Sequence, residues 1–289
     1  MMEIDGAAQA QIEASITDAD YLKFSDFFYR KTGIRFDEKR KYFVLKRLAR
    51  RILETGCDGF RAYFTKMRFE AAQTEFQQLT NAMTVNETYF FREEYQLKAL
   101  VGPILDEIVS RSNGAGPLRI WSMPCATGEE PYSIALMLLE SWPPIDRVDV
   151  QLLASDIDTR ALAAAEAGRY SARSVQYVPK DQLRRHFKKV SEHEYEISED
   201  VRDCVERSHL NLQDPEIVRK VAPIDVIFCR NLLIYFDDTS RRQAAESFFE
   251  ILKPGGFILL GHSESMSRMS SLFKVRKFQD CIVYQKPLS

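Results

Sequence analysis

Acidic side chains follow two short apolar runs in the second half of the chain. Residues 118–123 lead into a turn with Gly128 and then Glu130, and residues 150–155 lead directly into Asp156. A carboxylate at a helix N-terminus complements the helix dipole and repels phosphate, so the first turn fits a ligand with a cationic amino or sulfonium group. A carboxylate at the end of a sheet strand can accept both hydroxyls of a ribose. Together these residues predict a nucleoside-type cofactor site.

Simpler explanations exist for both positions. Glu130 could belong to an ordinary acidic first helical turn. Asp156 could cap the next helix, a role that Asp158 or Thr159 would fill as well, so that Asp158 caps while Asp156 binds. The first turn lacks the GxGxxG pattern, which disfavours a dinucleotide oxidoreductase.

Two further polar groups could belong to the same site. The apolar run 224–229 ends in Arg230, Asn231 and Tyr235, although a core tyrosine and a turn asparagine would explain two of these. Upstream, Asn86, Thr88 and Arg92 precede the strand-rich part of the chain. The planar guanidinium of Arg92 suits a substrate carboxylate. The alternative is a surface arginine paired with a neighbouring glutamate.

The elements that would position these residues follow from periodicity. Residues after 117 alternate apolar runs with helical stretches, which predicts βαβ units in a largely parallel sheet. The expected strands are 118–123, 150–155, 224–229, 256–261 and 281–285, the last of them antiparallel, with an insertion whose EYEI and VERSHL pieces form a small hairpin. Before residue 112 the pattern is helical, over 17–31, 58–69, 71–84 and 93–110, and SNGAGP at 112–117 breaks it.

One predicted helix is strongly basic. Residues 30–51 hold ten Lys/Arg and two acidic residues, a local balance of +8. The spacing predicts a buried face, which consists of Tyr42, Leu45, Leu48, Ala49 and Ile52. It also predicts four cations on the outer face, which are Lys46, Arg47, Arg50 and Arg51. This patch suits an acidic partner, with nucleic acid, anionic lipid and an acidic helical protein all open, or is simply a solvated face.

Composition excludes several classes. A net charge of -2 over 289 residues argues against a nucleic-acid-coating protein. Five scattered cysteines without a CxxC pair and four histidines without ligand spacing indicate reduced thiols and no metal site. No apolar run approaches the roughly 18 residues of a membrane span, and the N-terminus lacks the features of a secretory signal. We therefore expect a cytoplasmic protein.

The order of the motifs is more specific than any one of them. The chain carries NETYFFRE, WSMPCATGEEPYSIA, ASDID, FCRNLLIYF, LKPGG and GHSE in succession between about residues 20 and 285. In this it resembles the chemotaxis receptor methyltransferases (CheR family), which are S-adenosylmethionine-dependent protein-glutamate O-methyltransferases. The resemblance implies an α/β fold: a class I methyltransferase (Rossmann-like) sheet with a small inserted β-subdomain, preceded by an all-α domain.

The resemblance also implies boundaries and roles. The expected parts are a helical domain over 1–90, a linking helix and linker over 91–116, and the methyltransferase domain over 117–289 with its insertion at about 170–208. The cofactor-binding residues would be Asn86, Thr88, Arg92, Glu130, Asp156, Asn211, Leu212, Asn231 and Leu232. Arg92 and Tyr235 would lie beside the transferring methyl group, and S-adenosylhomocysteine would be the product.

The implied partners are methyl-accepting chemotaxis receptors, whose acidic helices the basic helix would contact. We expect a monomer that does not bind nucleic acid and does not insert directly into a membrane. Some family members bind a C-terminal receptor peptide through a glycine-bearing loop of the β-subdomain. The matching stretch here, KKVSEHEYEI, has no glycine, so we expect no such tether. The alternative to an enzyme is a cofactor-binding adaptor without catalysis.

Overall fold

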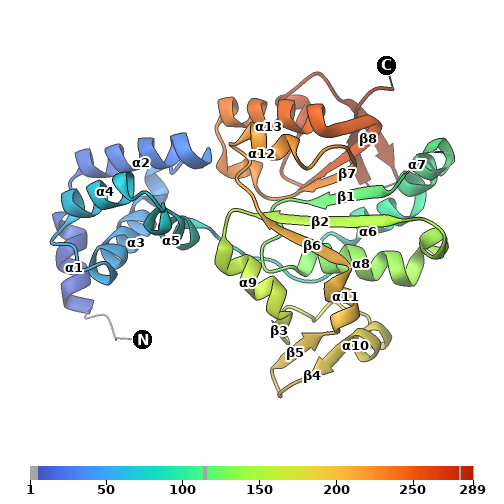
Figure 1. The fold of residues 1–289 in the computed structure, drawn as a ribbon, viewed down its shortest axis with the longest axis horizontal. Helices are drawn as coiled ribbons and strands as arrows, with labels where there is room; N and C mark the ends of the chain where they lie inside the picture. The colour runs from blue at the N-terminus through green and yellow to red at the C-terminus, as the bar shows by residue number, and fades with distance from the viewer. Residues whose placement is uncertain (1–5, 113–115, 280, 289) are drawn as a thin grey trace. The chain divides into compact units, whose positions relative to one another are not determined.

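The computed structural model describes residues 6–112, 116–279 and 281–288. The chain forms two compact units, residues 1–85 with 235–237 and residues 86–234 with 238–289 (Figure 1).

The first unit is helical, as the periodicity predicted. Thr17 and Asp20 form a reciprocal capping box at the start of its second helix, and Gly33 ends that helix with a left-handed φ of 71°. Phe24, Phe28 and neighbouring aromatic rings fill the core. The helices are α1 (Gly6–Ser15), α2 (Asp18–Thr32), α3 (Lys41–Glu54), α4 (Phe60–Phe69) and α5 (Thr74–Met83), with a 3₁₀ turn at Glu38–Arg40.

The buried face of α3 differs from the predicted one. Leu48, Ala49 and Ile52 are buried as expected, but Tyr42 is 68% exposed. Val44 is buried in its place, which gives a face with i, i+4, i+8 spacing through Leu48 and Ile52. The expectation for Tyr42 was wrong because its aromatic ring was assigned to the core. The buried face of the helix is formed by Val44, Leu48, Ala49 and Ile52 without it.

A seven-stranded sheet forms the centre of the second unit. Its strand order is β6-β2-β1-β7-β8-β10-β9, and all strands run parallel except β10, which is antiparallel to its neighbours β8 and β9. The strands are β1 (Leu118–Ser122), β2 (Val150–Asp156), β6 (Val205–His209), β7 (Ile224–Cys229), β8 (Leu252–Leu260), β9 (Lys274–Phe278) and β10 (Cys281–Gln285). All five expected strands are present, and the antiparallel placement of the last one is confirmed.

Helices cover both faces of this sheet (Figure 1). The helices are α6 (Glu94–Ala99), α7 (Leu105–Ser112), α8 (Glu129–Ser141), α9 (Thr159–Ala167), α12 (Pro215–Arg219) and α13 (Asp238–Ile251). Side chains of successive strand residues point to opposite faces, so Ile120 joins the core that includes residues of α8. Trp121 points the other way, and its ring meets Phe248 of α13 edge-on at 6.2 Å. This two-sided burial is why the central strands β1, β2, β7 and β8 are mostly apolar.

The insertion differs from the expected hairpin. The EYEI piece forms β5 (Glu194–Ile197), which lies between β3 (Arg169–Ser171) and β4 (Phe187–Lys189) in a separate three-stranded sheet. The VERSHL piece does not pair with it. It forms β6, the parallel neighbour of β2 in the main sheet, which corrects the sequence-based expectation. Two short helices, α10 (Lys180–His186) and α11 (Glu199–Asp203), complete the insertion.

The helical stretch predicted for 93–110 is interrupted. A π-helical segment at Leu100–Ile104 separates α6 from α7, with Gly102 in a non-helical conformation and Pro103 behind it. Of the SNGAGP breaker that follows, residues 113–115 lie outside the described residues.

Candidate functional site

The site lies at the carboxyl edge of the main sheet. Asp156 is the last residue of β2 and stands in register with His209 at the end of β6. Asn211 follows β6, and Asn231 follows β7. Because these strands are parallel, their carboxyl ends meet at one edge, where open α/β sheets bind their ligands.

Asp156 is held rigidly by two backbone N–H groups. Ala126 donates to one carboxylate oxygen and Asp158 to the other, both at 2.8 Å. Burial raises the pKa of Asp156 to about 6, against the stabilising effect of these N–H donors. Asp158 caps α9, so Asp156 is not needed as a cap. A carboxylate has about four lone-pair sites, so Asp156 can accept further donors in addition to these N–H groups.

The turn between β1 and α8 requires its glycine. Gly128 has a φ of 98°, and a Cβ there would lie 2.7 Å from the ring of Tyr132 and 2.9 Å from the hydroxyl of Tyr170. Two carboxylates follow at the start of α8. Glu129 accepts from Thr127 and Ser174, and Glu130 accepts from Ser122 at 2.7 Å.

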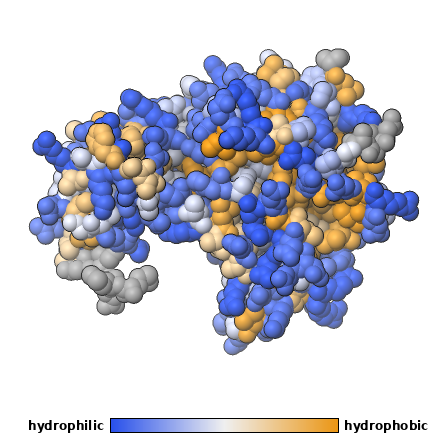
Figure 2. Space-filling view, in the orientation of Figure 1, coloured by the Kyte–Doolittle hydropathy of each residue, from blue (hydrophilic) through white to orange (hydrophobic). Residues whose placement is uncertain are grey.

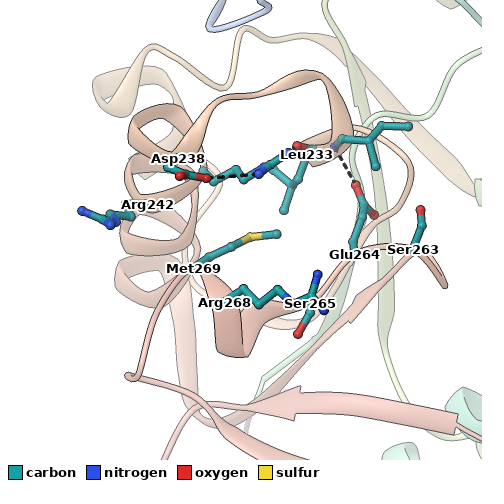
Figure 3. A pocket seen from close by; sticks show the side chains of 10 residues that line it. Leu233, Asp238, Arg242, Ser263, Glu264, Ser265, Arg268 and Met269 are labelled. Carbon is teal, nitrogen blue, oxygen red and sulfur yellow. Dashed lines mark hydrogen bonds and ion pairs between the residues drawn. The ribbon is translucent and has the colours of Figure 1, made fainter.

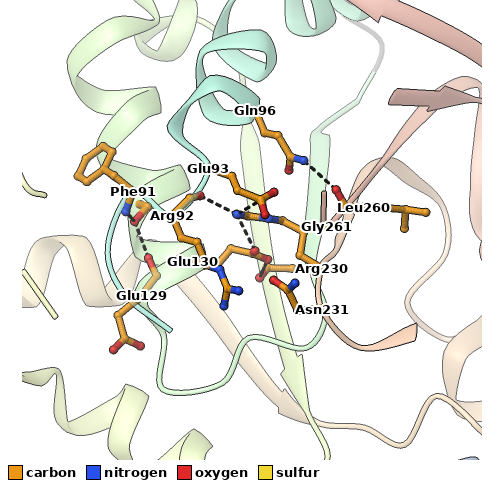
Figure 4. Close-up of polar contacts among 12 residues, drawn as sticks. Phe91, Arg92, Glu93, Gln96, Glu129, Glu130, Arg230, Asn231, Leu260 and Gly261 are labelled. Atoms are coloured by element: carbon orange, nitrogen blue, oxygen red, sulfur yellow. Dashed lines mark hydrogen bonds and ion pairs between the residues drawn. The ribbon is translucent and has the colours of Figure 1, made fainter. Parts of the chain in front are cut away.

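A buried arginine connects this turn to the segment at residues 91–93 (Figure 4). The side chain of Arg230 is 3% exposed, and it pairs with Glu130 at 3.0 Å and with Glu93 at 3.3 Å. It also donates to the carbonyl oxygen of Arg92 at 2.6 Å. One guanidinium therefore fixes two carboxylates and one backbone carbonyl. Its Nε is buried and has no acceptor within the described part of the chain.

The two carboxylates that pair with Arg230 have opposite pKa shifts. Burial raises the pKa of Glu130 despite the opposing charge of Arg230 and the hydroxyl of Ser122. Burial acts in the same direction on Glu93, but Arg230 and His262 outweigh it and lower the pKa of that carboxyl. His262 Nδ1 lies 2.8 Å from Glu93. Arg230 thus opposes the effect of burial, which favours the neutral form of Glu130.

The segment that carries Arg92 is conformationally strained. Phe91 and Glu93 have φ values of 59° and 54°, the left-handed region that non-glycine residues rarely adopt. Such residues cost of order 1–3 kcal/mol each and persist only where surrounding contacts hold them. Here the Phe91 N–H donates to Ser133, and Arg230 holds the Arg92 carbonyl. These contacts determine the direction of the Arg92 side chain.

The guanidinium of Arg92 has no carboxylate partner among the described residues. It donates to the Glu87 carbonyl at 2.9 Å and lies 5.8 Å from the centre of the Tyr89 ring. The alternative pairing with Glu93 does not form, because Glu93 binds Arg230 and His262 instead. Arg92 is therefore able to bind an incoming anion.

The other candidate cofactor residues lie around the same edge. Asn86 donates to Asp158 at 2.8 Å, and Thr88 is half-buried two residues later. Leu212 is buried, and the side-chain oxygen of Asn211 accepts from Gln213. Asn231 has a left-handed φ of 58°, and its N–H donates to Glu264. Leu232, beside it, is half-buried.

Tyr235 belongs to the first unit by its contacts. Its carbonyl accepts from the N–H of Arg35, and the guanidinium of Arg40 lies 4.5 Å from the centre of its ring. A place for Tyr235 beside the transferring methyl group stays a prediction.

The four cations of α3 differ in exposure. Lys46 and Arg50 are exposed, as predicted. Arg51 is only 17% exposed and pairs with the buried Glu75 at 2.6 Å. Arg47 is half-buried, donates to the Ala82 carbonyl and stacks on Phe43. The expectation that all four point outward was wrong for Arg47 and Arg51, because their long side chains fold back onto the helix bundle.

Sequence reasoning named Arg230 but gave it no role, and it missed Glu93 and Glu264. A charged residue directly after the apolar run 224–229 was the available signal for Arg230. Glu264, in the GHSE motif, accepts from the N–H groups of Asn231 and Gly261 and so joins the loops after β7 and β8.

The described residues contain neither a metal-ligand cluster nor a helix that could span a membrane. No three His, Cys, Asp or Glu side chains gather there as metal ligands would. None of the described helices has the length and apolar character to cross a membrane.

Comparison with known proteins identifies the family. Residues 86–282 match the model of the CheR methyltransferase SAM-binding domain, and residues 19–84 match the CheR all-alpha domain. The chain is 52% identical to chemotaxis protein methyltransferase 2 of Vibrio cholerae over 95% of both chains. It is 33% identical to the chemotaxis protein methyltransferase of Salmonella typhimurium, over 91% of this chain and 89% of that one.

Among solved structures, this chain is similar to the N-methyltransferase NodS from Bradyrhizobium japonicum in complex with S-adenosylhomocysteine. The similarity has a TM-score of 0.38 and 14% identity and covers 78% of this chain and 98% of that chain. The family matches cover both units of the fold, and the expected fold class and S-adenosylmethionine cofactor are confirmed. This chain belongs to the CheR family of S-adenosylmethionine-dependent methyltransferases that act in chemotaxis.

Proposed function

We propose that this protein methylates glutamate side chains of chemotaxis receptors in the cytoplasm, where it acts as a monomer. The observation that carries the proposal is Arg92, a guanidinium without a carboxylate partner among the described residues, fixed through its backbone to the buried Arg230–Glu130 pair. It is suited to orient an acceptor carboxylate. In the reaction a glutamate Oε would bond to the sulfonium methyl carbon while the C–S bond electrons return to sulfur.

The residues present fit the cofactor. Asp156 is buried at the end of β2, and Glu130, whose side chain is 12% exposed, lies in the first turn of α8. Their carboxylates match a ribose diol and a cationic amino acid portion, respectively. We assign the cofactor contacts to them and to the half-buried or buried residues around the same edge, which are Asn86, Thr88, Asn211, Leu212, Asn231 and Leu232.

The protein's task in this reaction is alignment. S-adenosylmethionine supplies an electrophilic methyl group when bound. A glutamate carboxylate has an ordinary pKa of about 4.3 and is ionised at neutral pH, so the site needs no general base. Arg92 would orient the carboxylate, and alignment of this kind contributes roughly 7–11 kcal/mol in favourable cases.

Base-labile labelling tests the proposal. Radiolabelled S-adenosylmethionine is incubated with the protein and receptor-containing membranes, and mild base then releases volatile methanol from any carboxyl ester. We expect a base-labile label on a receptor-sized band. Absence of label, with S-adenosylhomocysteine still bound, would instead support a non-catalytic adaptor.

Cofactor binding should weaken in mild acid. The diol needs the ionised carboxylate of Asp156, whose pKa of about 6 means that protonation competes as the pH falls through this value. Titration with S-adenosylhomocysteine from pH 8 to pH 5 should show affinity falling below pH 6. Asp156→Asn should bind about tenfold more weakly at pH 7.5 because a charge-assisted bond is lost. The affinity of this variant should also no longer depend on pH between 8 and 5. If the pH dependence were retained, another titrating group would be its cause.

Receptor docking should depend on the exposed cations of α3. The double substitution Lys46→Glu/Arg50→Glu should slow receptor methylation several-fold at low salt and little at high salt, because surface electrostatics mainly sets the association rate. Lys66→Glu/Arg61→Glu makes the same charge change on the exposed side of α4 and is the matched control. Equal slowing by both pairs would indicate a net-charge effect rather than docking.

We also propose that no receptor tail peptide is needed. The turn between β4 and β5, residues 190–193, has no glycine, and the visible face of this subdomain is mostly hydrophilic (Figure 2). Calorimetry with a C-terminal receptor peptide should detect no tight binding. A micromolar or tighter dissociation constant would contradict this expectation.

A further inference from the structure

A cavity lies beside the residues assigned above to the cofactor. It has a volume of about 350 Å³ and lies between α13 and the loops that follow β7 and β8 (Figure 3). Its lining residues are Leu233, Ile234, Asp238, Arg241, Arg242, Ser263, Glu264, Ser265, Arg268 and Met269. The cavity therefore opens beside the same strand ends that carry Asn231.

The walls of this cavity are fixed by hydrogen bonds. Glu264 accepts from the N–H groups of Asn231, Ile234 and Gly261, which joins the two loops. Buried Met266 anchors the short turn that carries Arg268. The pocket is a formed feature of the fold and does not depend on a ligand to assemble it.

The available charge in the pocket is positive. The carboxylate of Asp238 pairs with Arg241 at 3.2 Å, and that of Glu264 is taken up by backbone N–H donors. Arg268 is exposed, and its guanidinium has no hydrogen-bond or ion-pair partner among the described residues, although its backbone N–H donates to the Ser265 carbonyl. Arg242 lies at the rim, with its guanidinium directed away from the cavity (Figure 3).

The rest of the lining is suited to a short aliphatic stem. Leu233 and Met269 face the cavity, and Ile234 is 42% exposed at its edge. A glutamate or aspartate side chain combines such a stem with one negative charge. A phosphate carries more charge and has no stem to contact the apolar part of the lining.

We propose that this cavity, the Arg268 pocket, binds a second acidic side chain of the protein substrate, near the glutamate that is methylated. This inference rests on the proposed function and extends it to substrate selection. An acceptor segment lying along the strand ends would place one carboxylate at Arg92 and another at Arg268, so the enzyme would prefer glutamates with acidic neighbours. Arg268 is a specificity residue and does not touch the reacting atoms.

Steady-state methylation of receptor-containing membranes tests the proposal. Arg268→Ala should raise the receptor KM about tenfold, as expected for one charge-assisted contact, and leave kcat and S-adenosylhomocysteine affinity unchanged. The receptor KM of Arg268→Lys should lie between those of the wild-type enzyme and Arg268→Ala. Arg147→Ala, at an exposed arginine in the loop before β2, is the control and should change nothing. An unchanged KM, or a loss of cofactor affinity, would overturn the proposal.

A paired substitution in the acceptor provides the sharper test. After the labelled glutamate is mapped, acidic residues three and four positions to either side are changed to glutamine or asparagine. For the wild-type enzyme, kcat/KM on the changed acceptor should be about tenfold lower than on the unchanged one. For Arg268→Ala, kcat/KM should be the same on both acceptors. If the enzyme substitution and the acceptor substitutions lowered kcat/KM independently, a contact between Arg268 and these acidic residues would be contradicted. Competition by inorganic phosphate that depends on Arg268, with no effect of the acceptor changes, would replace the proposal by a phosphate site.

Binding of hexaglutamate, measured by calorimetry, separates the two ideas. If hexaglutamate binding depends on Arg268 but no ester forms on receptor-containing membranes, the pocket is retained and the proposed receptor methylation is refuted. Ester formation that is insensitive to Arg268 and to acceptor acidity would do the reverse.

Discussion

Replacing Arg230 by alanine is expected to abolish cofactor binding at neutral pH and to lower the free energy of unfolding of the second unit by about 3–5 kcal/mol. The side chain is 3% exposed and is shared by Glu130, Glu93 and the Arg92 carbonyl. Its removal leaves two buried carboxylates without their cation. This is more costly than the loss of an exposed ion pair because water cannot replace the partner.

The effect on binding follows from the pKa of Glu130. Burial already raises that pKa, and Arg230 is the charge that opposes the shift. Without Arg230 the pKa rises further, and a protonated Glu130 cannot attract the ammonium group of the cofactor. The lost affinity should therefore return partly as the pH is raised from 7 to 9. Calorimetric titration with S-adenosylhomocysteine over this range measures it, and chemical denaturation measures the stability.

A second substitution keeps the test valid if the alanine variant unfolds. Arg230→Lys retains the positive charge but cannot reach three acceptors at once, so it should fold and bind S-adenosylhomocysteine about tenfold more weakly. Arg276→Ala is the control in the same unit, since Arg276 pairs with Glu107 at 2.8 Å on the edge strand β9. It should cost stability without changing cofactor affinity. Normal affinity in Arg230→Lys together with a flat pH profile in Arg230→Ala would show that Arg230 is only a structural residue.

The sheet was predictable because its strands are buried on both faces. Runs such as 224–229 are mostly apolar, with Asp225 as the one charged residue, so their type and approximate limits follow from composition. Asp156 was predictable for a related reason, because a carboxylate directly after such a run lies at the sheet edge. Glu130 was predictable because the glycine turn after the first run leads into a helix that begins with acidic residues. β6 was not, since its polar sequence, VERSH, reflects an edge strand with one partner, β2.

The contacts of the arginines could not be derived from spacing. Arg51 and Arg50 are adjacent in sequence, yet one is buried against Glu75 and the other is exposed. Their difference depends on α5, which brings Glu75 to α3 from 24 residues away. The role of Arg230 likewise depends on partners 100 and 137 positions upstream, Glu130 and Glu93. Such long-range pairing is set by the tertiary fold and has no periodic signature.

Replacing Arg92 by alanine should reduce kcat by about 100-fold or more while S-adenosylhomocysteine affinity changes by less than about threefold. The guanidinium has no carboxylate to hold among the described residues, so its removal leaves no buried charge unpaired. The strained backbone at Phe91 and Glu93 stays held by Ser133 and Arg230, which contact main-chain atoms of the segment. The substitution therefore removes an orienting group and keeps the loop that carried it.

The expected split between kcat and affinity has a specific origin. A guanidinium that orients the acceptor carboxylate contributes where that carboxylate must be aligned with the methyl group, and the cofactor alone gains nothing from it. Arg92→Lys should restore only part of the rate, because an ammonium provides charge without the planar pair of donors. Initial-rate measurements with receptor-containing membranes and calorimetry with S-adenosylhomocysteine give the two quantities.

Arg173→Ala is the matched control for Arg92, since Arg173 is 84% exposed and its guanidinium lies 3.7 Å from the carboxylate of Glu87, whose carbonyl accepts from Arg92. It should leave both kcat and affinity unchanged. Equal losses of rate and affinity in Arg92→Ala would make Arg92 a cofactor-binding residue only. The acceptor carboxylate would then need another cation, and the exposed guanidinium of Arg268 would be the first to test, with kcat in place of KM as the quantity that falls.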